Sequence, residues 1–398
     1  MVVGNETRRM KIVCDNNMPF AREAFGTLGE VRVLDGRQIT PADLRDADLL
    51  AVRSTCLVNR ELLDGAAVRF VGTATIGFDH FDVPYLERRG IRWCCAPGCN
   101  ANSVAEYVTA ALLRLAVRHG FPLAGKTIGV VGVGNVGALV ARQAEALGLR
   151  VLRNDPPRQR RECGAPGGES APGPFVPLRA VLAEADVITL HAPLTRAGPD
   201  ATWHMADGAF FGRMKPGGVF LNTARGAVAD TAALLAAVAG GRVAHAVVDT
   251  WEGEPVCRRD LLDRVALGTP HIAGHSFEGK ALGTVMVYRE ACRFLGVAPA
   301  WSPDRCWPSP RVPAVAADAG GRPDEEVLDG IVRQVYDIEA DDRRLRASRG
   351  GDARERAAAF DELRRTYPVR REFRFTRVTL RHASPQLLRT IERLGFLV

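Results

Sequence analysis

Three polar residues in the second half of the chain, Arg225, Glu254 and His271, have side chains of the types that a hydride transfer from a 2-hydroxy acid needs. A guanidinium binds a carboxylate through two parallel hydrogen bonds. An imidazole can take the hydroxyl proton as hydride leaves, and a carboxylate beside it orients the ring and stabilises its protonated form. Taken singly, each residue is more often an ordinary surface arginine, turn acid or buried histidine. The inference therefore rests on their occurring together.

The sequence around each of these residues predicts that it follows a β-strand. Arg225 comes after GVFLNTA, Glu254 comes after AHAVVDTW, and His271 lies in TPHIAG. Open α/β sheets bind their ligands at the carboxyl ends of the strands. We therefore expect these side chains to gather at one edge of a parallel sheet.

A dinucleotide-binding pattern precedes them, in TIGVVGVGNVGALVARQAEALGLRVLRND. An apolar run feeds Gly132, Gly134 and Gly137, which open an amphipathic helix, and a second run ends at Asp155. The three glycines suit a tight turn, close approach to a pyrophosphate and close helix–strand packing, and the helix N-terminus favours phosphate. Asp155 is expected to accept hydrogen bonds from the adenosine ribose and to disfavour a 2′-phosphate. The pattern predicts NAD as the cofactor, with Asp249 facing the nicotinamide carboxamide.

Two histidines, His271 and His275, lie four positions apart and raise the question of a metal pair. Such a pair works on a helix, where both side chains share a face, but Pro270 and Gly274 predict a turn at a strand end. No metal site is therefore expected. We therefore expect the two histidines to have separate roles, with His271 as the acceptor of the substrate proton.

The whole chain of 398 residues alternates apolar β runs with helical segments, which predicts an α/β fold with parallel sheets covered on both faces. We expect a substrate-binding or lid domain at 1–101 with 275–300, an NAD-binding Rossmann domain at 102–274, and a small α+β domain at 303–398. Ser103 with Glu106 is expected to cap the helix that joins the first two. The polar stretch 158–177 is expected to be a surface loop, and 302–326 has the composition of a linker.

Composition limits the classes of partner and compartment. Nine scattered cysteines do not suggest a disulfide framework, and there is no secretory signal and no apolar run long enough to span a bilayer, so a cytoplasmic protein is expected. The net charge of +7 comes mostly from residues 331–398, which hold 16 Arg against 10 Asp and Glu. Interleaved acids there indicate a salt-bridged surface more than a nucleic-acid site. Neither nucleic acid nor a membrane is expected as a partner.

With these motifs in place, the chain resembles the NAD-dependent D-2-hydroxyacid dehydrogenases. The resemblance is strongest to the subgroup that oxidises 4-phospho-D-erythronate, through DNNMPFARE, FVGTATIGFDH, APGCNANSVAEYV, NTARGAV, WEGEP and GTPHIAG. VYDIEADDRRLR and FDELRRTYPVRREF resemble the C-terminal dimerisation domain of that subgroup, so a homodimer through 303–398 is implied. The implied reaction oxidises C2 of the substrate and reduces NAD.

The resemblance also implies roles for individual residues. It assigns catalytic roles to Arg225, Glu254 and His271. It implies NAD contacts at Asn135, Val136, Asp155, Ala192, Thr223, Ala224, Arg225, Asp249 and Gly274. It implies substrate contacts at Ser54, Thr75 and position 275, where His275 replaces a tyrosine usual in the subgroup. We hypothesise that Arg53 binds the substrate phosphate, together with Arg346 of the partner subunit.

Other functions stay open at this stage. One is another dehydrogenase of the same family, of the 3-phosphoglycerate or the glyoxylate and hydroxypyruvate type, with the C-terminal segment as a regulatory module. Another is an NAD-sensing, corepressor-like binding protein on the same fold. A third is a nucleic-acid-binding tail. Turnover with a panel of hydroxy acids separates the first two, and a salt-sensitive DNA shift would reveal the third.

Overall fold

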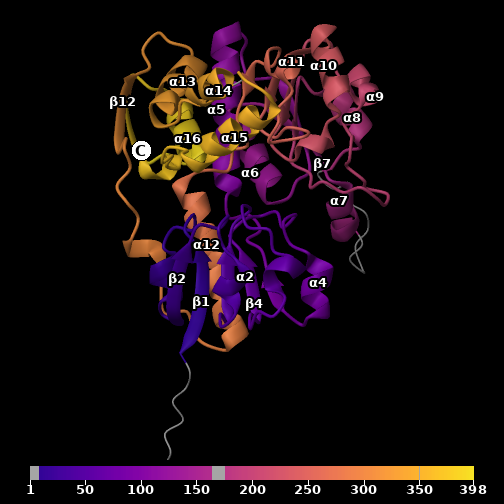
Figure 1. The fold of residues 1–398 in the computed structure, drawn as a ribbon. Coiled ribbons are helices and arrows are strands. Elements are labelled where there is room, and N and C mark those ends of the chain that lie inside the picture. The colour runs from indigo at the N-terminus through magenta and orange to yellow at the C-terminus, as the bar shows by residue number, and fades with distance from the viewer. Residues whose placement is uncertain (1–8, 164–174, 349) are drawn as a thin grey trace, which may run out of the picture. The chain divides into compact units, whose positions relative to one another are not determined.

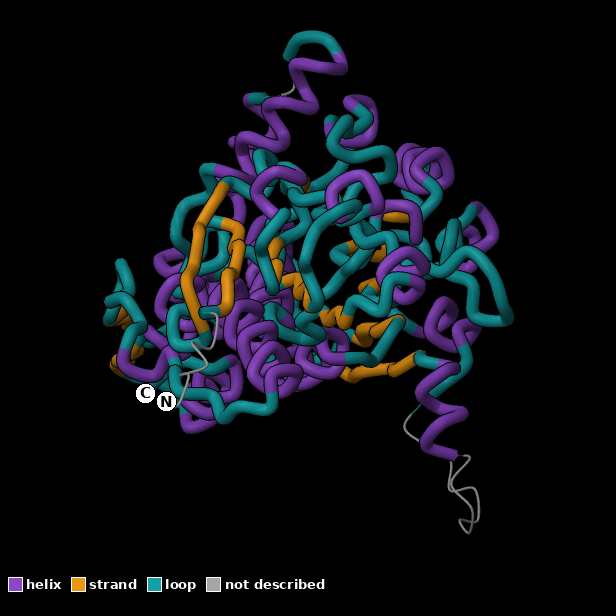
Figure 2. Tube along the Cα trace, turned by 60° about the horizontal axis from the view of Figure 1, so that its bottom comes forward, coloured by secondary structure: helices purple, strands orange, loops and turns teal. Residues whose placement is uncertain are grey.

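The computed structural model describes residues 9–163, 175–348 and 350–398, and the chain divides into two compact units. The first unit comprises residues up to 100 together with 276–309, and the second comprises 101–275 and 310–398 (Figure 1). Strands in each unit are flanked by helices (Figure 2). The predicted α/β class with parallel sheets is confirmed.

The first unit is built on a five-stranded parallel sheet in the order β2-β1-β3-β4-β5. Its strands are β1 (Met10–Asp15), β2 (Gly29–Leu34), β3 (Leu49–Val52), β4 (Phe70–Thr73) and β5 (Arg92–Cys94). Its helices are α1 (Ala21–Phe25), α2 (Pro41–Leu44), α3 (Arg60–Leu63), α4 (Val83–Arg88) and the long α12 (Phe277–Leu295). The strand order reverses between β1 and β3, and such a switch point is where open α/β sheets form a crevice.

The second unit contains a six-stranded parallel sheet in the order β11-β10-β9-β8-β6-β7. Its strands are β6 (Thr127–Val131), β7 (Arg150–Asn154), β8 (Val187–Leu190), β9 (Gly218–Asn222), β10 (Val243–Val248) and β11 (Leu267–Gly268). Its helices are α5 (Ala101–His119), α6 (Asn135–Ala146), α7 (Pro156–Cys163), α8 (Leu178–Glu184), α9 (Gly208–Arg213), α10 (Thr231–Ala239) and α11 (Arg259–Leu262). Strands β6, β8 and β9 are buried along their whole length, because helices cover both faces of the sheet.

The C-terminal segment belongs to the second unit. It forms β12 (Ala314–Asp318), α13 (Asp324–Val335), α14 (Ile338–Ala347), α15 (Ala353–Arg365), β13 (Arg377–Arg381) and α16 (Pro385–Leu394), with β12 and β13 paired in parallel. Helix α13 packs on α5, and α16 packs on α6 (Figure 1). The apolar residues of the C-terminal segment therefore belong to the same hydrophobic core as those of the six-stranded sheet.

Several local predictions are wrong, each because a tertiary contact decides the structure. Helix α5 begins at Ala101, so Ser103 and Glu106 are not its cap but buried residues inside it. The Ser103 hydroxyl instead donates to Glu372 at 3.1 Å, and Glu106 accepts from the backbone N–H of Phe373 at 2.9 Å. The C-terminal segment takes the hydrogen bonds that a cap would have used.

Other errors concern segments with little periodicity. The expected loop 158–177 is helical in its first part, because α7 extends to Cys163, while 164–174 lie outside the described residues. The expected linker 302–326 contains β12, a short Ala-rich strand defined by its pairing with β13. The charged DIEADDRRLR, by contrast, is salt-bridged as expected: it forms α14, where the Asp337 side chain caps the first turn and Arg346 pairs with Asp342 at 2.8 Å.

Candidate active site

The turn between β6 and α6 has the geometry of a phosphate-binding loop. Gly132 has φ +85°, and a Cβ there would lie 2.6 Å from the backbone N of Ala192 on the neighbouring strand end. A Cβ on Gly137 would lie 2.0 Å from the carbonyl oxygen of Gly132, so only glycine lets the helix approach the strand this closely. These two glycines set the path of the loop at the switch point between β6 and β8.

Gly134 does not pack against protein. A Cβ there would meet no atom within 4 Å, and Gly134 and Asn135 are exposed at the first turn of α6. The loop therefore leaves an open cradle over the N-terminus of a twelve-residue helix, whose free N–H groups attract phosphate. These residues, with Val136 in the same turn, fit the pyrophosphate of NAD.

Asp155 follows β7 and supports the same loop. Its carboxylate accepts from the backbone N–H of Val133 at 2.8 Å and from that of Arg158 at 2.9 Å. The Arg158 guanidinium in turn donates to the carbonyl of Val133 at 2.6 Å. The carboxylate thus holds the glycine loop in place, and its hydrogen bond to the adenosine ribose stays a prediction.

His191 is a residue of this site that the sequence reasoning missed. It lies just after β8 beside Ala192, and its ring bonds the hydroxyls of Thr189 at 2.9 Å and Thr223 at 3.2 Å. Burial lowers the pKa of His191 to about 3, so the ring is neutral at physiological pH. It fixes Thr223, a predicted NAD contact, and its only sequence signal was its position at a strand end.

Glu254 and His271 form a directly bonded pair, as their sequence positions predicted. The His271 Nδ1 lies 2.6 Å from a Glu254 carboxylate oxygen, and the other oxygen accepts from the backbone N–H of Trp251 at 3.0 Å. Burial tends to raise the pKa of Glu254, but the nearby charge and hydrogen bond of His271 and the Trp251 N–H outweigh burial and lower it. The carboxylate is therefore ionised at neutral pH, and Nε2 is left as the ring atom that can accept a proton.

Arg225 lies on the turn after β9, and hydrogen bonds and a close backbone approach fix the path of that turn. The Asn222 side chain accepts from the N–H of Ala224 at 3.1 Å and donates to the carbonyl of Arg225 at 3.1 Å. A Cβ on Gly226 would lie 2.1 Å from the carbonyl carbon and oxygen of Trp251. Gly226 therefore lets the Arg225 turn contact the loop that carries Glu254. Gly226 lies in the NTARGAV motif, but the sequence alone did not indicate this role.

Asp249, at the end of β10, has a visible structural role. It is 1% exposed, and its carboxylate accepts from the Thr269 hydroxyl at 2.6 Å and from the N–H groups of Ile272 at 2.8 Å and Ala273 at 3.0 Å. Burial raises its pKa, against the lowering effect of His271 and these hydrogen bonds. Asp249 therefore organises the turn that carries His271, and its contact with the nicotinamide stays a prediction.

His271 and His275 point to different partners. His271 has φ +55°, a left-handed conformation that non-glycine residues adopt only where surrounding structure enforces it. His275 instead packs against Tyr367, with ring centroids 5.8 Å apart at 74°. The predicted turn is confirmed, and no group of three or more His, Cys, Asp or Glu side chains suited to a metal occurs in the described ranges.

The predicted substrate residues of the first unit, Arg53, Ser54 and Thr75, lie just beyond the ends of the neighbouring strands β3 and β4. The Arg53 guanidinium donates to the carbonyl of Ala74 at 3.3 Å, which brings the two strand ends together. Asp15, buried at the end of β1, accepts from the Arg53 N–H at 3.3 Å and supports this turn. Ser54 is exposed on it.

Arg346 does not have the freedom that our hypothesis requires. It is bound within its own chain, to Asp342 at 2.8 Å and to the carbonyls of Leu262 at 2.5 Å and Val265 at 2.9 Å. Its guanidinium is committed to joining α14 to the loop after α11. These contacts contradict the hypothesis that Arg346 binds the substrate phosphate.

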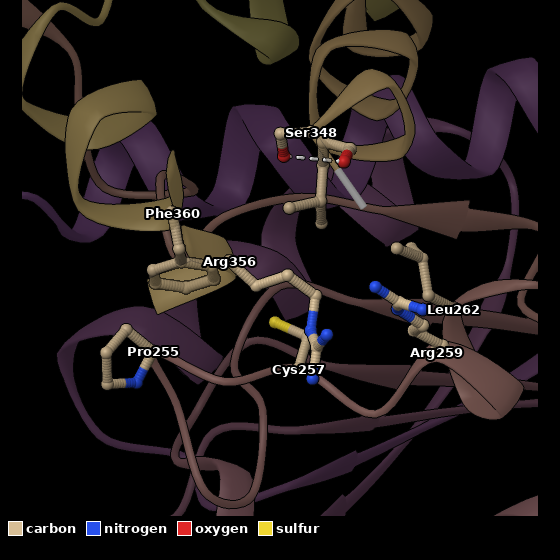
Figure 3. Close-up of a pocket in the computed structure, with 8 residues that line it drawn as sticks. Pro255, Cys257, Arg259, Leu262, Ser348, Arg356 and Phe360 are labelled. Atoms are coloured by element: carbon tan, nitrogen blue, oxygen red, sulfur yellow. Dashed lines mark hydrogen bonds between the residues drawn. The ribbon is translucent and has the colours of Figure 1, made fainter. Parts of the chain in front are cut away.

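A small cavity lies near the Glu254 loop, between that loop and helices α14 and α15 (Figure 3). It holds about 20 Å³ and is lined by Pro255, Cys257, Arg259, Leu262, Leu345, Ser348, Arg356 and Phe360. This space suits no more than a single water molecule. It is not a ligand site.

Comparison with known proteins shows which families and relatives this chain resembles. The family described as "D-isomer specific 2-hydroxyacid dehydrogenase, NAD binding domain" matches residues 104–273, and a "Domain of unknown function (DUF3410)" matches residues 308–395. Erythronate-4-phosphate dehydrogenase of Citrobacter koseri is 44% identical over 387 residues, which cover 97% of this chain and 98% of that protein. The protein of the same name from Marinobacter nauticus is 45% identical over 97% of this chain and 99% of its own.

Solved structures resemble a part of the chain. The TT0316 protein from Thermus thermophilus matches with a TM-score of 0.60 and 28% identity over 73% of this chain and 99% of its own. D-Lactate dehydrogenase from Aquifex aeolicus, complexed with NAD and lactic acid, matches with a TM-score of 0.57 and 25% identity over 72% of this chain and 95% of its own. No helix among the described residues is long and apolar enough to cross a membrane.

Proposed function

We infer that this chain, which belongs to the D-isomer specific 2-hydroxyacid dehydrogenase family, oxidises C2 of 4-phospho-D-erythronate to give (R)-3-hydroxy-2-oxo-4-phosphooxybutanoate. This reaction is a step of pyridoxal 5′-phosphate biosynthesis. The chain is an NAD-dependent oxidoreductase, as its family is. The substrate is supported by the near full-length similarity to erythronate-4-phosphate dehydrogenases. The observation that carries the chemistry is the 2.6 Å contact between His271 and Glu254.

In the proposed reaction, His271 takes the proton of the C2 hydroxyl. Its Nδ1 is engaged by Glu254, so Nε2 is the accepting atom, and the ionised carboxylate stabilises the imidazolium that results. Bound NAD supplies the hydride acceptor. Arg225 binds the substrate carboxylate and holds C2 in place, since a guanidinium fork matches a carboxylate.

The other end of the substrate is assigned to Arg53, Ser54, Thr75 and His275. Arg53 supplies the positive charge that a phosphate requires. The Thr75 hydroxyl lies 2.7 Å from that of Thr73 and donates to the carbonyl of Gly77 at 2.8 Å, so its oxygen is held in a fixed position. A fixed hydroxyl suits recognition of a polar substrate.

We also propose that the protein is a cytoplasmic homodimer that assembles through residues 303–398. Within each subunit, we propose a lid domain at 1–101 with 275–300 and an NAD-binding domain at 102–274. The eight cysteines whose side chains the structure describes are all free thiols, which fits a reducing compartment. Val369, Leu397 and Val398 expose apolar surface in the C-terminal segment. Light scattering on the full chain tests the dimer.

The decisive experiment is oxidation of 4-phospho-D-erythronate with NAD, followed by NADH absorbance for the wild type and His271→Asn. We expect turnover by the wild type and a loss of at least about 10²-fold in kcat for the variant. A panel containing 3-phosphoglycerate, glycerate and lactate tests selectivity. Faster turnover of another hydroxy acid would reassign the substrate, and no turnover of any would favour a binding protein.

A further inference from the structure

The turn that carries His271 is held in a costly conformation. His271 has φ +55°, a left-handed backbone conformation that is unfavourable for a non-glycine residue. Asp249 binds the N–H groups of Ile272 and Ala273 on one side of this turn. These bonds satisfy two backbone N–H groups of the turn. The buried carbonyl groups of the turn need hydrogen-bond donors from elsewhere.

Arg370, from the C-terminal segment, provides such a partner. Its Nη2 donates to the carbonyl of Ala273 at 2.5 Å and to the carbonyl of Ser103, in α5, at 3.1 Å. The side chain is 5% exposed, and its guanidinium lies 4.4 Å from the centre of the Tyr336 ring. One buried cation therefore bridges the catalytic turn and the first turn of α5.

The segment around Arg370 is itself firmly bound to the nucleotide-binding part of this unit. The next residues make the hydrogen bonds already described, from Ser103 to Glu372 and from Phe373 to Glu106. Tyr367, three residues earlier, packs edge-to-face on His275 and donates to Asp341 at 2.8 Å. The C-terminal segment thus contacts the catalytic turn at two points, Ala273 and His275.

Stability alone does not explain this use of an arginine. Nε and Nη1 of Arg370 are buried and have no hydrogen-bond partner in the described part of the chain. An unsatisfied buried donor destabilises the folded state, because it loses its hydrogen bonds to water and gains none in the protein. Such a cost is commonly found where structure is held for function.

We propose that Arg370 is a positioning residue: by bridging Ala273 and Ser103 it fixes the turn that carries His271, and the C-terminal segment thereby sets the geometry of proton transfer. This proposal rests on the function proposed above for His271. It gives the domain of unknown function a role in catalysis in addition to the proposed assembly. A displacement of about 1 Å at the reacting group is enough to cost on the order of 10²-fold in rate.

The test uses Arg370→Lys in the full-length chain, because lysine keeps the buried positive charge but loses the planar fork. Arg114→Lys is the matched control. Arg114 is also a largely buried arginine that joins α5 to the C-terminal segment, through Asp329 at 2.7 Å and Glu339 at 3.1 Å. These ion pairs do not involve the turn that carries His271. Both variants are compared with the wild type in kcat, KM for NAD, melting temperature and the solvent isotope effect in D2O, where the C2 hydroxyl that His271 deprotonates carries deuterium.

We expect kcat to fall 10- to 100-fold in Arg370→Lys, KM for NAD to change less than threefold, and the isotope effect to rise as chemistry becomes rate-limiting. Arg114→Lys should keep kcat within threefold and the wild-type isotope effect. A smaller folded fraction lowers kcat without changing the isotope effect, so the two explanations separate. Should Arg370→Lys not fold, Arg370→Gln and Arg114→Gln give the same comparison.

Two results would overturn the proposal: a folded Arg370 variant with kcat and isotope effect near those of the wild type, or equal losses in the Arg114 control. Inactivity of the wild type toward every hydroxy acid would refute the proposed function instead. An active wild type with unaffected Arg370 variants would refute only the positioning role.

Discussion

Replacing Gly226 with alanine tests how closely the catalytic loops must approach. The new Cβ would lie 2.1 Å from the carbonyl carbon and oxygen of Trp251 and 2.3 Å from the backbone N of Glu252. Carbon atoms in contact sit about 3.5 Å apart, and backbone atoms cannot rotate away as a flexible side chain does. The Arg225 turn and the Glu254 loop must therefore separate by about 1.4 Å.

That displacement should act on catalysis more than on folding. A 1 Å error in the relative positions of catalytic groups costs about 10²-fold in rate, whereas overpacking typically costs about 1–3 kcal/mol of stability. We expect kcat/KM for 4-phospho-D-erythronate to fall about 10²-fold while the variant still unfolds cooperatively in urea. The Kd for NAD, measured by fluorescence titration, should rise less than kcat/KM falls, because the pyrophosphate loop after β6 is untouched even though the displaced turn carries the predicted NAD contacts Thr223 and Ala224.

Gly212→Ala is the matched control for this variant. Gly212 lies in α9 of the same unit, and a Cβ there would meet no atom within 4 Å. An unstrained change from glycine to alanine stabilises by about 0.4–1 kcal/mol, so activity should stay at the wild-type value. Gly226→Ala with kcat/KM within threefold of the wild type would refute the reasoning that this close approach positions Arg225.

Three further predictions follow from single side chains. Gly134→Ala should still fold cooperatively, since its Cβ meets no protein atom, yet raise the Kd for NAD tenfold or more; unchanged affinity would show that the cradle does not hold the pyrophosphate. His275→Tyr should keep activity, since the resemblance to the subgroup implies a tyrosine at this position, and its inactivity with an intact fold would contradict the assignment. Burial lowers the pKa of His191 to about 3, below an unfolded value of about 6.5. Its contribution to stability is thus complete above pH 6.5 and lost as pH falls toward 3, with a slope of about 1.4 kcal/mol per pH unit. Urea unfolding of His191→Gln between pH 6.5 and 4.5 should lack that slope, and an identical pH dependence would contradict this.

The sequence by itself determined the features that depend on local spacing. The glycines after β6, the acid after β7 and the polar residues after β9, β10 and β11 follow from strand ends and turn chemistry, because parallel strands carry their carboxyl ends to one edge. The pairing of Glu254 with His271 was predictable for the same reason. Their placement required no knowledge of side-chain packing.

Tertiary structure decided the local conformation where the sequence pattern was weak or where a distant residue competed for the same hydrogen bonds. Ser103 and Glu106 form a plausible capping box in sequence, yet Glu372 and Phe373, about 270 positions away, bind them inside the helix. Short β12 exists because β13 lies beside it. The link from Arg370 to the turn of His271 spans 97 positions. A contact across that distance leaves no trace in local spacing, because it is fixed only when the C-terminal segment packs on α5.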